Sequence, residues 1–265
     1  MIRAIQLFSL IALLAACAGQ PGTPSGTTGP ASIPISEQAP SGMAEKSAKT
    51  HTELGTLYLQ AGNVAVALEE ARIATAFDPN YAPGHNLMGL VQILLNDTAM
   101  AKASFERAIQ LAPGDPQIAN DYGWFLCQSG REQEAMNYFS LAARNPLYKT
   151  PTRPYTNAGL CALRMKDDKL AEENFQRALV FDGSNVQAIF HLANLAYKRG
   201  DYFTAKRYLG EVQRNTEPNA ESLWLGVRIE RKLGDRQAEA SLASQLRRKF
   251  AGSPEYQALM QGKYE

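Results

Sequence analysis

Small and apolar residues recur along this chain at a spacing of about 34 residues, beginning at residue 48. In most units of that length, glycine stands at the eighth position, alanine at the twentieth and often a large apolar residue at the twenty-fourth. Small residues at such spacings let two helices of a unit approach closely, and the large residue fills the remaining space. These positions hold Gly55, Gly89, Gly123, Gly159 and Gly226, then Ala67, Ala101, Ala135, Ala171, Ala205 and Ala238, then Phe105, Phe139 and Phe175.

This period is typical of helix-turn-helix tetratricopeptide units. The sequence therefore predicts an all-α fold, a right-handed superhelix (α-solenoid) of six tetratricopeptide repeats plus a C-terminal capping helix. Tyr256, Leu259 and Met260 of that helix would cover the open end of the stack. The predicted units span residues 48–81, 82–115, 116–151, 152–185, 186–218 and 219–252, and the capping helix and tail span residues 253–265.

The first 16 residues have the pattern of a bacterial signal peptide. Arg3 precedes an apolar stretch, residues 4–14, that is too short to span a bilayer. The Leu-Ala-Ala-Cys sequence ending at Cys17 resembles the lipoprotein cleavage box, and the residues after it favour the outer membrane, facing the periplasm. The alternative is an ordinary signal peptide that happens to end beside a cysteine. Residues 17–47 are rich in Gly, Pro, Ser and Thr, which predicts a lipidated Cys17 followed by a flexible tether.

Composition gives no sign of catalysis or of nucleic-acid binding. The net charge is +1, so there is no overall attraction to nucleic acid. His51, His85 and His191 lie in different units without metal-ligand spacing, and no phosphate-binding loop is present. We therefore expect a protein that is not an enzyme and has no cofactor, no metal site and no small-molecule substrate.

Stacked first helices of such repeats form a concave wall that binds protein partners. Inward positions on this wall hold polar and aromatic side chains. Asparagine amides there would either pair with a partner's backbone or bond to neighbouring repeats, and the tryptophan would either contact a partner or pack in the core. The candidate residues are Asn86, Asn120, Trp124, Arg153, Asn157 and Asn194.

The first unit offers a second candidate surface. Ala71 stands where later units have phenylalanine, and no unit precedes this one to cover Leu57, Val64 or Leu68. The N-terminal end would then expose an apolar groove for a partner's hydrophobic segment. The alternative is that the tether, or its residues Ile33 and Ile35, folds back over this surface.

Two of the three cysteines lie on the first helices of consecutive units. Cys127 and Cys161 hold the twelfth and tenth positions of units three and four. Two residues along a helix turn the side chain by about 200°, so the two thiols on facing helices would point at each other. A disulfide is therefore expected in an oxidising periplasm, with two small buried thiols as the alternative.

Three motifs in the central units resemble one known family, the type IV pilus biogenesis and stability lipoproteins of the PilW/PilF kind, the secretin pilotins. They are Asp121-Tyr-Gly-Trp-Phe-Leu-Cys-Gln128, Asn145-Pro-Leu-Tyr148 with Thr150-Pro151, and Asn157-Ala-Gly-Leu-Cys161.

This resemblance implies an outer-membrane lipoprotein that binds the pilus secretin and promotes its localisation and multimerisation, for pilus biogenesis and twitching motility. The alternative is a periplasmic scaffold lipoprotein for cell-wall hydrolases or outer-membrane protein assembly.

Overall fold

The computed structural model describes residues 33–264, which form thirteen α-helices and one short 3₁₀ helix, with no strand in that range. The all-α repeat architecture predicted from the sequence is confirmed. The elements are η1 (Ile35–Glu37), α1 (Met43–Gln60), α2 (Val64–Phe77), α3 (Ala82–Leu94), α4 (Thr98–Leu111), α5 (Pro116–Gln128), α6 (Glu132–Ala143), α7 (Thr152–Arg164), α8 (Asp168–Phe181), α9 (Val186–Lys198), α10 (Tyr202–Asn215), α11 (Ala220–Leu233), α12 (Arg236–Lys249) and α13 (Pro254–Met260).

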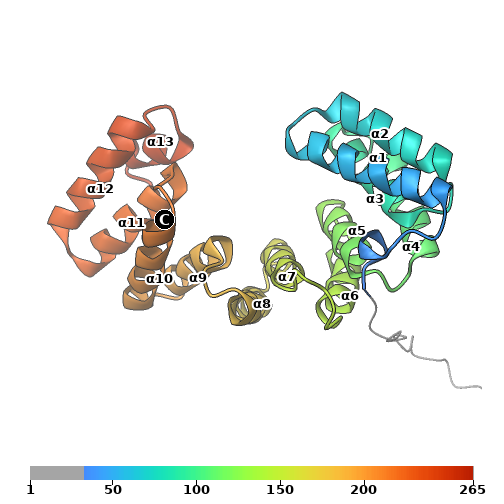
Figure 1. Ribbon diagram of the computed structural model, residues 1–265. Coiled ribbons are helices and arrows are strands. Elements are labelled where there is room, and N and C mark those ends of the chain that lie inside the picture. Colours follow the sequence, from blue (N-terminus) through green and yellow to red (C-terminus); the bar gives the residue numbers. More distant parts are fainter. Residues whose placement is uncertain (1–32, 265) are drawn as a thin grey trace, which may run out of the picture.

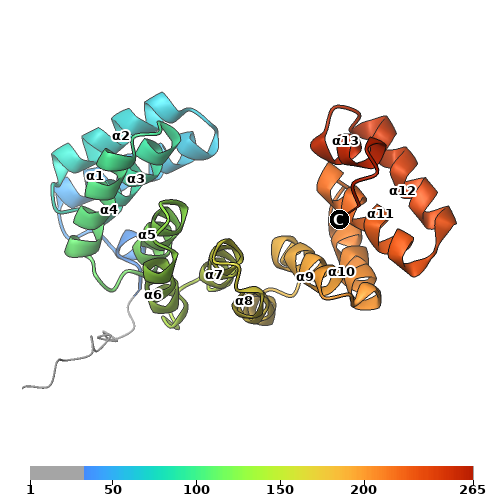
Figure 2. The same ribbon diagram turned by 180° about the vertical axis from the view of Figure 1, so that it is seen from behind.

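Consecutive helices pair and follow one another along an open arc, with α1 to α4 at one end and α11 to α13 at the other (Figures 1 and 2). Each first helix also contacts the first helix of the next unit, from α1 with α3 through to α9 with α11. The first helices therefore form one continuous layer. Within residues 33–264, no helix is both long and apolar enough to cross a membrane.

A glycine facing a buried ring sets the distance between the two helices of each central unit. A Cβ atom added to Gly159 would lie 2.5 Å from the ring of Phe175, and one added to Gly123 would lie 2.9 Å from that of Phe139. Both rings are almost fully buried. Because the ring occupies the space that a side chain would need, only glycine allows this helix spacing.

Unit one obtains the same packing from a different residue. Its twenty-fourth position is Ala71, which is too small to reach Gly55. Instead, Leu87 of the next unit places Cδ2 within 2.6 Å of where a Cβ of Gly55 would be. The first unit is thus completed by α3 of the second.

The described part of the predicted tether is folded. We expected a flexible segment through residue 47, but η1 and the first turns of α1 lie within it. The backbone and hydroxyl of Ser41 both bond to the Glu45 carboxylate, which holds the first turn of α1. Ala48 is fully buried, so the helix must already be formed where the predicted unit begins.

The connection between α6 and α7 is longer than the others. It spans residues 144–151, whereas residues 78–81 and 112–115 suffice for the two preceding units. Tyr148 in this connection is buried and donates its hydroxyl to Gln117 of α5 at 2.9 Å, and Lys149 pairs with Glu37 at 2.7 Å. The extra residues therefore hold the connection that leads to unit four against unit three and η1.

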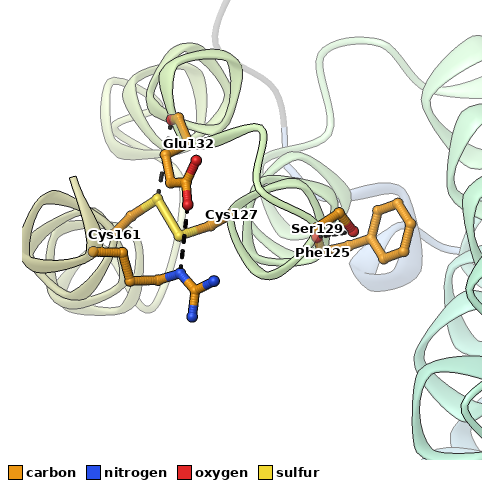
Figure 3. Close-up of a disulfide and its surroundings, with 6 residues drawn as sticks. Phe125, Cys127, Ser129, Glu132 and Cys161 are labelled. Atoms are coloured by element: carbon orange, nitrogen blue, oxygen red, sulfur yellow. Dashed lines mark hydrogen bonds and ion pairs between the residues drawn. A yellow bond between two sulfur atoms is a disulfide. The ribbon is translucent and has the colours of Figure 1, made fainter.

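A disulfide joins Cys127 on α5 to Cys161 on α7, with their Cα atoms 5.9 Å apart. Figure 3 shows the bond between the two helices, with Glu132 of α6 beside it. Both cysteines are fully buried. The bond crosses the same junction as the long connection, so units three and four are held both covalently and by packing.

The final helix covers the end of the stack, but only with part of the expected residues. Tyr256 and Leu259 pack against a cluster that includes Trp224 and Leu246. Met260, by contrast, is 68% exposed. The reason is that α13 is only seven residues long and presents a single face to α11 and α12.

Loss of the disulfide should lower the free energy of unfolding by about 3 to 4 kcal/mol, because the unfolded chain regains the entropy of a closed loop. Urea unfolding followed by circular dichroism would compare the oxidised protein, the reduced protein and the Cys127→Ser/Cys161→Ser variant. Reductant should weaken the native protein and leave the double variant unchanged. Equal stability of the oxidised and reduced native protein would contradict the expectation.

Gly159→Ala should destabilise the protein by about 1 to 3 kcal/mol, since the added methyl group collides with Phe175 in a filled core. Gly210→Ala is the matched control, because Gly210 also lies in a helix and its nearest neighbour would be an Arg214 side-chain nitrogen at 3.8 Å. That substitution should leave stability unchanged or raise it by up to about 1 kcal/mol. Thermal unfolding of both variants measures the difference, and equal effects would rule out the proposed contact.

Candidate protein-binding groove

A groove of about 510 Å³ opens over the first helices of units one to three; we call it the unit 1–3 groove. Its walls come from α1, α3 and α5, and its edges from η1 and the start of α7. Apolar surface with a few polar groups is typical of sites that bind part of another molecule. The lining residues are Ser36, Glu37, Thr52, Glu53, Thr56, Leu57, Tyr81, Pro83, Asn86, Leu87, Leu90, Asp115, Gln117, Ile118, Asp121 and Arg153.

Asp121 is the centre of a hydrogen-bond network at this groove. Its carboxylate accepts from the side-chain amides of Asn86 (2.9 Å), Gln117 (2.8 Å) and Asn120 (3.1 Å). A guanidinium nitrogen of Arg153 lies 3.7 Å away. These four partners stabilise a carboxylate that is almost fully buried. The network therefore connects α3, α5 and α7.

The network extends further along α7 through Asn157, whose side-chain amide donates to the side-chain oxygen of Asn120 at 2.9 Å. Asn120 is fully buried, so its amide serves contacts between repeats. The sequence left two roles open for the asparagines, pairing with a partner's backbone or bonding to a neighbouring repeat. In the structure, Asn120 and Asn157 bond to each other across neighbouring repeats. The candidates chosen from the sequence include Asn120 but not Asp121, because successive residues of a helix point about 100° apart. Its place directly after Asn120 was the available signal.

Three buried polar atoms at the groove have no hydrogen-bond partner within residues 33–264. They are the hydroxyls of Thr52 and Tyr81 and the side-chain oxygen of Asn86. Burial raises the pKa of the Tyr81 hydroxyl above its ordinary value. An unmade hydrogen bond of a buried group costs about 1 to 3 kcal/mol.

The segment that precedes α1 lies along the edge of this groove. The backbone N–H of Ile35 donates to Asp115 at 2.7 Å, and Ile35 packs beside Ile118. Burial raises the pKa of the Asp115 carboxyl. Hydrogen bonds from the backbone N–H groups of Ile118, Ile35 and Gln117 lower it, but by less, so the net shift is upward. The sequence left open a fold-back of Ile35 over the apolar residues of unit one. In the structure, Ile35 packs against units two and three instead.

The other predicted residues on the first-helix layer lie apart from the groove. Trp124 is half-buried and packs against the core cluster that contains Phe139. Asn194 lies on α9, where its amide donates to the carbonyl of Phe190 at 3.2 Å. Arg153, in contrast, is exposed and lines the groove.

The four residues proposed for a unit-one surface do not form one exposed patch. Ala71 is fully buried, and Val64 and Leu68 are partly buried against a cluster formed with α3. Only Leu57 is open, at 61% exposure, and it lines the unit 1–3 groove. The second unit covers this face because Leu87 fills the space beside Gly55.

The described residues, 33 to 264, contain no group of three or more His, Cys, Asp or Glu side chains placed to hold a metal ion. Each histidine has contacts near its own unit: His51 with Glu70 at 2.6 Å, His85 with the Pro79 carbonyl at 2.9 Å, and His191 stacked on Phe175. The predicted signal peptide and the lipidation site at Cys17 lie outside the described residues.

Comparisons with known proteins agree with the repeat geometry. Models of the tetratricopeptide repeat family match residues 82–115 and 187–219. The type IV pilus assembly protein PilF of Pseudomonas aeruginosa is 31% identical over 207 residues, which are 78% of this chain and 82% of that protein. An uncharacterized protein of Haemophilus influenzae is 25% identical over 153 residues, 58% of this chain and 86% of that protein.

Two solved structures of similar proteins share most of this arrangement of helices. The structure of Pseudomonas aeruginosa PilF superposes with a TM-score of 0.76 at 30% identity, covering 83% of this chain and 99% of that one. The structure of PilW, described as a widely conserved type IV pilus biogenesis factor, superposes with a TM-score of 0.74 at 29% identity. The match covers 80% of this chain and 98% of that one. The chain therefore belongs to the PilF family of tetratricopeptide repeat proteins of type IV pilus biogenesis.

Proposed function

We propose that this protein is an outer-membrane lipoprotein that acts as a pilotin, binding the pilus secretin and promoting its outer-membrane localisation and multimerisation. The observation that carries this proposal is the 31% identity with PilF over 82% of that protein. The solved relatives are repeat scaffolds, which favours a role in protein interaction over catalysis.

The unit 1–3 groove supports the binding step. An extended secretin segment laid across α1 and α3 would lie against the groove wall that includes Thr52, Tyr81 and Asn86. Leu57, at 61% exposure, offers an apolar contact on the same wall. In such a complex apolar contacts supply affinity, and the few polar groups orient the bound segment.

The position of η1 supports coupling between the anchor and the groove. Only residues 18–34 separate the lipidation site proposed at Cys17 from Ile35, which is bonded to Asp115. A secretin segment in the groove would therefore be carried within reach of the membrane that holds the lipid.

Cys17→Ala should release the protein from the outer-membrane fraction, because no acyl chain can be attached. Secretin monomers should then accumulate away from the outer membrane, and multimers in isolated outer membranes should fall. Immunoblots of fractionated cells measure both quantities. Normal secretin multimers in cells that carry Cys17→Ala would contradict the proposal.

Leu57→Arg should weaken secretin binding at least about tenfold, because a charge replaces the exposed apolar contact in the groove. Leu54→Arg is the matched control, since Leu54 lies one turn away on α1, is 37% exposed and is not part of the groove. Co-purification of secretin with each variant, checked by thermal unfolding, gives the comparison. Equal loss in both variants would contradict binding in the groove.

Photo-crosslinkers at three sites in cells would identify the contacting face. Crosslinks to secretin are expected from Leu57, in the groove, and not from Leu68 or Trp124, which pack against the core. Capture of cell-wall hydrolases or of outer-membrane protein assembly factors without secretin would instead support the alternative scaffold role.

A further inference from the structure

A second polar site lies at the opposite end of the solenoid, between α9, α11 and the C-terminal tail; we call it the Arg228 site. It is lined by Tyr197, Arg228, Arg231, Lys232, Lys263 and Tyr264, with Gly262 beside them. Four of these side chains are cationic and none is acidic. The overall charge of +1 hides this local concentration.

Arg228 is the central group of this site. It is half-buried, its Nε atom has no hydrogen-bond partner, and no carboxylate pairs with it in the described chain. Lys232 and Lys263 are exposed and likewise have no ion pair within residues 33–264. Arg231 is partly neutralised by Glu239, at 2.9 Å. A partly desolvated cation without an acidic partner is costly, so the site favours an added anionic group.

Aromatic rings hold these cations in place. The Arg228 guanidinium lies 4.9 Å from the ring centre of Tyr197 and 5.7 Å from that of Trp224. Arg231 lies 4.0 Å from the ring centre of Tyr264, whose backbone carbonyl accepts from the Tyr197 hydroxyl at 3.3 Å. Ring contacts stabilise a guanidinium but do not use its N–H donors, which remain available to a carboxylate.

An adjoining pocket shares Tyr197 and Arg228 with this site and has a different character. Leu163 and Leu195 supply apolar surface, and Asn194 supplies an amide. The amide nitrogen of Asn194 already bonds to its own helix, which leaves the side-chain oxygen as an acceptor. The two pockets together could receive an acidic residue, a neighbouring apolar residue and a backbone N–H.

We propose that the Arg228 site binds an acidic, extended segment of a protein partner, with a carboxylate against Arg228, Lys232 and Lys263 and an apolar neighbour beside Leu163 and Leu195. A peptide fits better than an anionic lipid surface for two reasons. The half-buried Arg228 lies in a pocket that a single carboxylate can enter, and the adjoining pocket offers the apolar surface of Leu163 and Leu195 to a neighbouring side chain. This site is separate from the unit 1–3 groove.

Fluorescence anisotropy at low salt would test the proposal on the full chain. The probe is a labelled ten-residue peptide with two Glu residues flanked by Leu, compared with the same peptide carrying Gln and with vesicles containing phosphatidylglycerol. We expect the acidic peptide to bind at least about tenfold more tightly than the Gln peptide. Arg228→Gln should remove about tenfold of that affinity, and Lys232→Gln about threefold.

Lys169→Gln is the matched control, because Lys169 is an exposed cation on α8 with no ion pair in the described chain, so the charge change is the same. Circular dichroism melting separates misfolding of Arg228→Gln from lost binding, and the exposed Lys232→Gln/Lys263→Gln variant tests the site without disturbing the packing.

Equal binding of the acidic peptide by all variants would overturn the proposal. Vesicle binding that exceeds peptide binding and is lost in Arg228→Gln would also overturn it, in favour of lipid. Because secretin takes no part, failure here leaves the pilotin proposal unaffected.

Discussion

The contact between a glycine and a buried ring within each central unit is the constraint on which the rest of the structure depends. At Gly159 and Phe175 the absence of a Cβ lets the ring fill the space between the two helices. That contact fixes the spacing of each pair and therefore the position of each first helix in the layer. The groove over α1, α3 and α5 exists because these helices are held at regular intervals.

The junction of units three and four is reinforced in three different ways. The long connection places Tyr148 against Gln117, the disulfide joins α5 to α7, and Asp121 gathers amides from α3 and α5 and a guanidinium from α7. Repeat proteins depend on contacts between neighbours, so a weak junction would let the stack bend. Here the hydrogen bonds, the ion pair and the disulfide oppose bending between the third and fourth units.

The two ends of the solenoid carry different surface chemistry. The unit 1–3 groove combines apolar walls with hydroxyl and amide groups, and its two buried carboxylates, Asp115 and Asp121, both accept hydrogen bonds from the protein. The Arg228 site combines rings with unpaired cations. A scaffold with two unlike surfaces can hold two segments of its partners, and the end next to η1 is the one that follows the proposed lipid anchor in sequence.

The sequence by itself determined the repeats, since Gly and Ala at fixed positions permit close helix contacts whatever surrounds them. It also indicated the cysteine pair and the family. Tertiary structure decided the rest, because burial depends on neighbours far away in the chain. Asn120 bonds to a neighbouring repeat, and Ala71 is buried beneath α3. Asp121 is the centre of a hydrogen-bond network because side chains from three helices lie around it. The Arg228 site likewise depends on the C-terminal tail, which packs beside α9 and α11. The repeat pattern in the sequence does not predict the position of that tail.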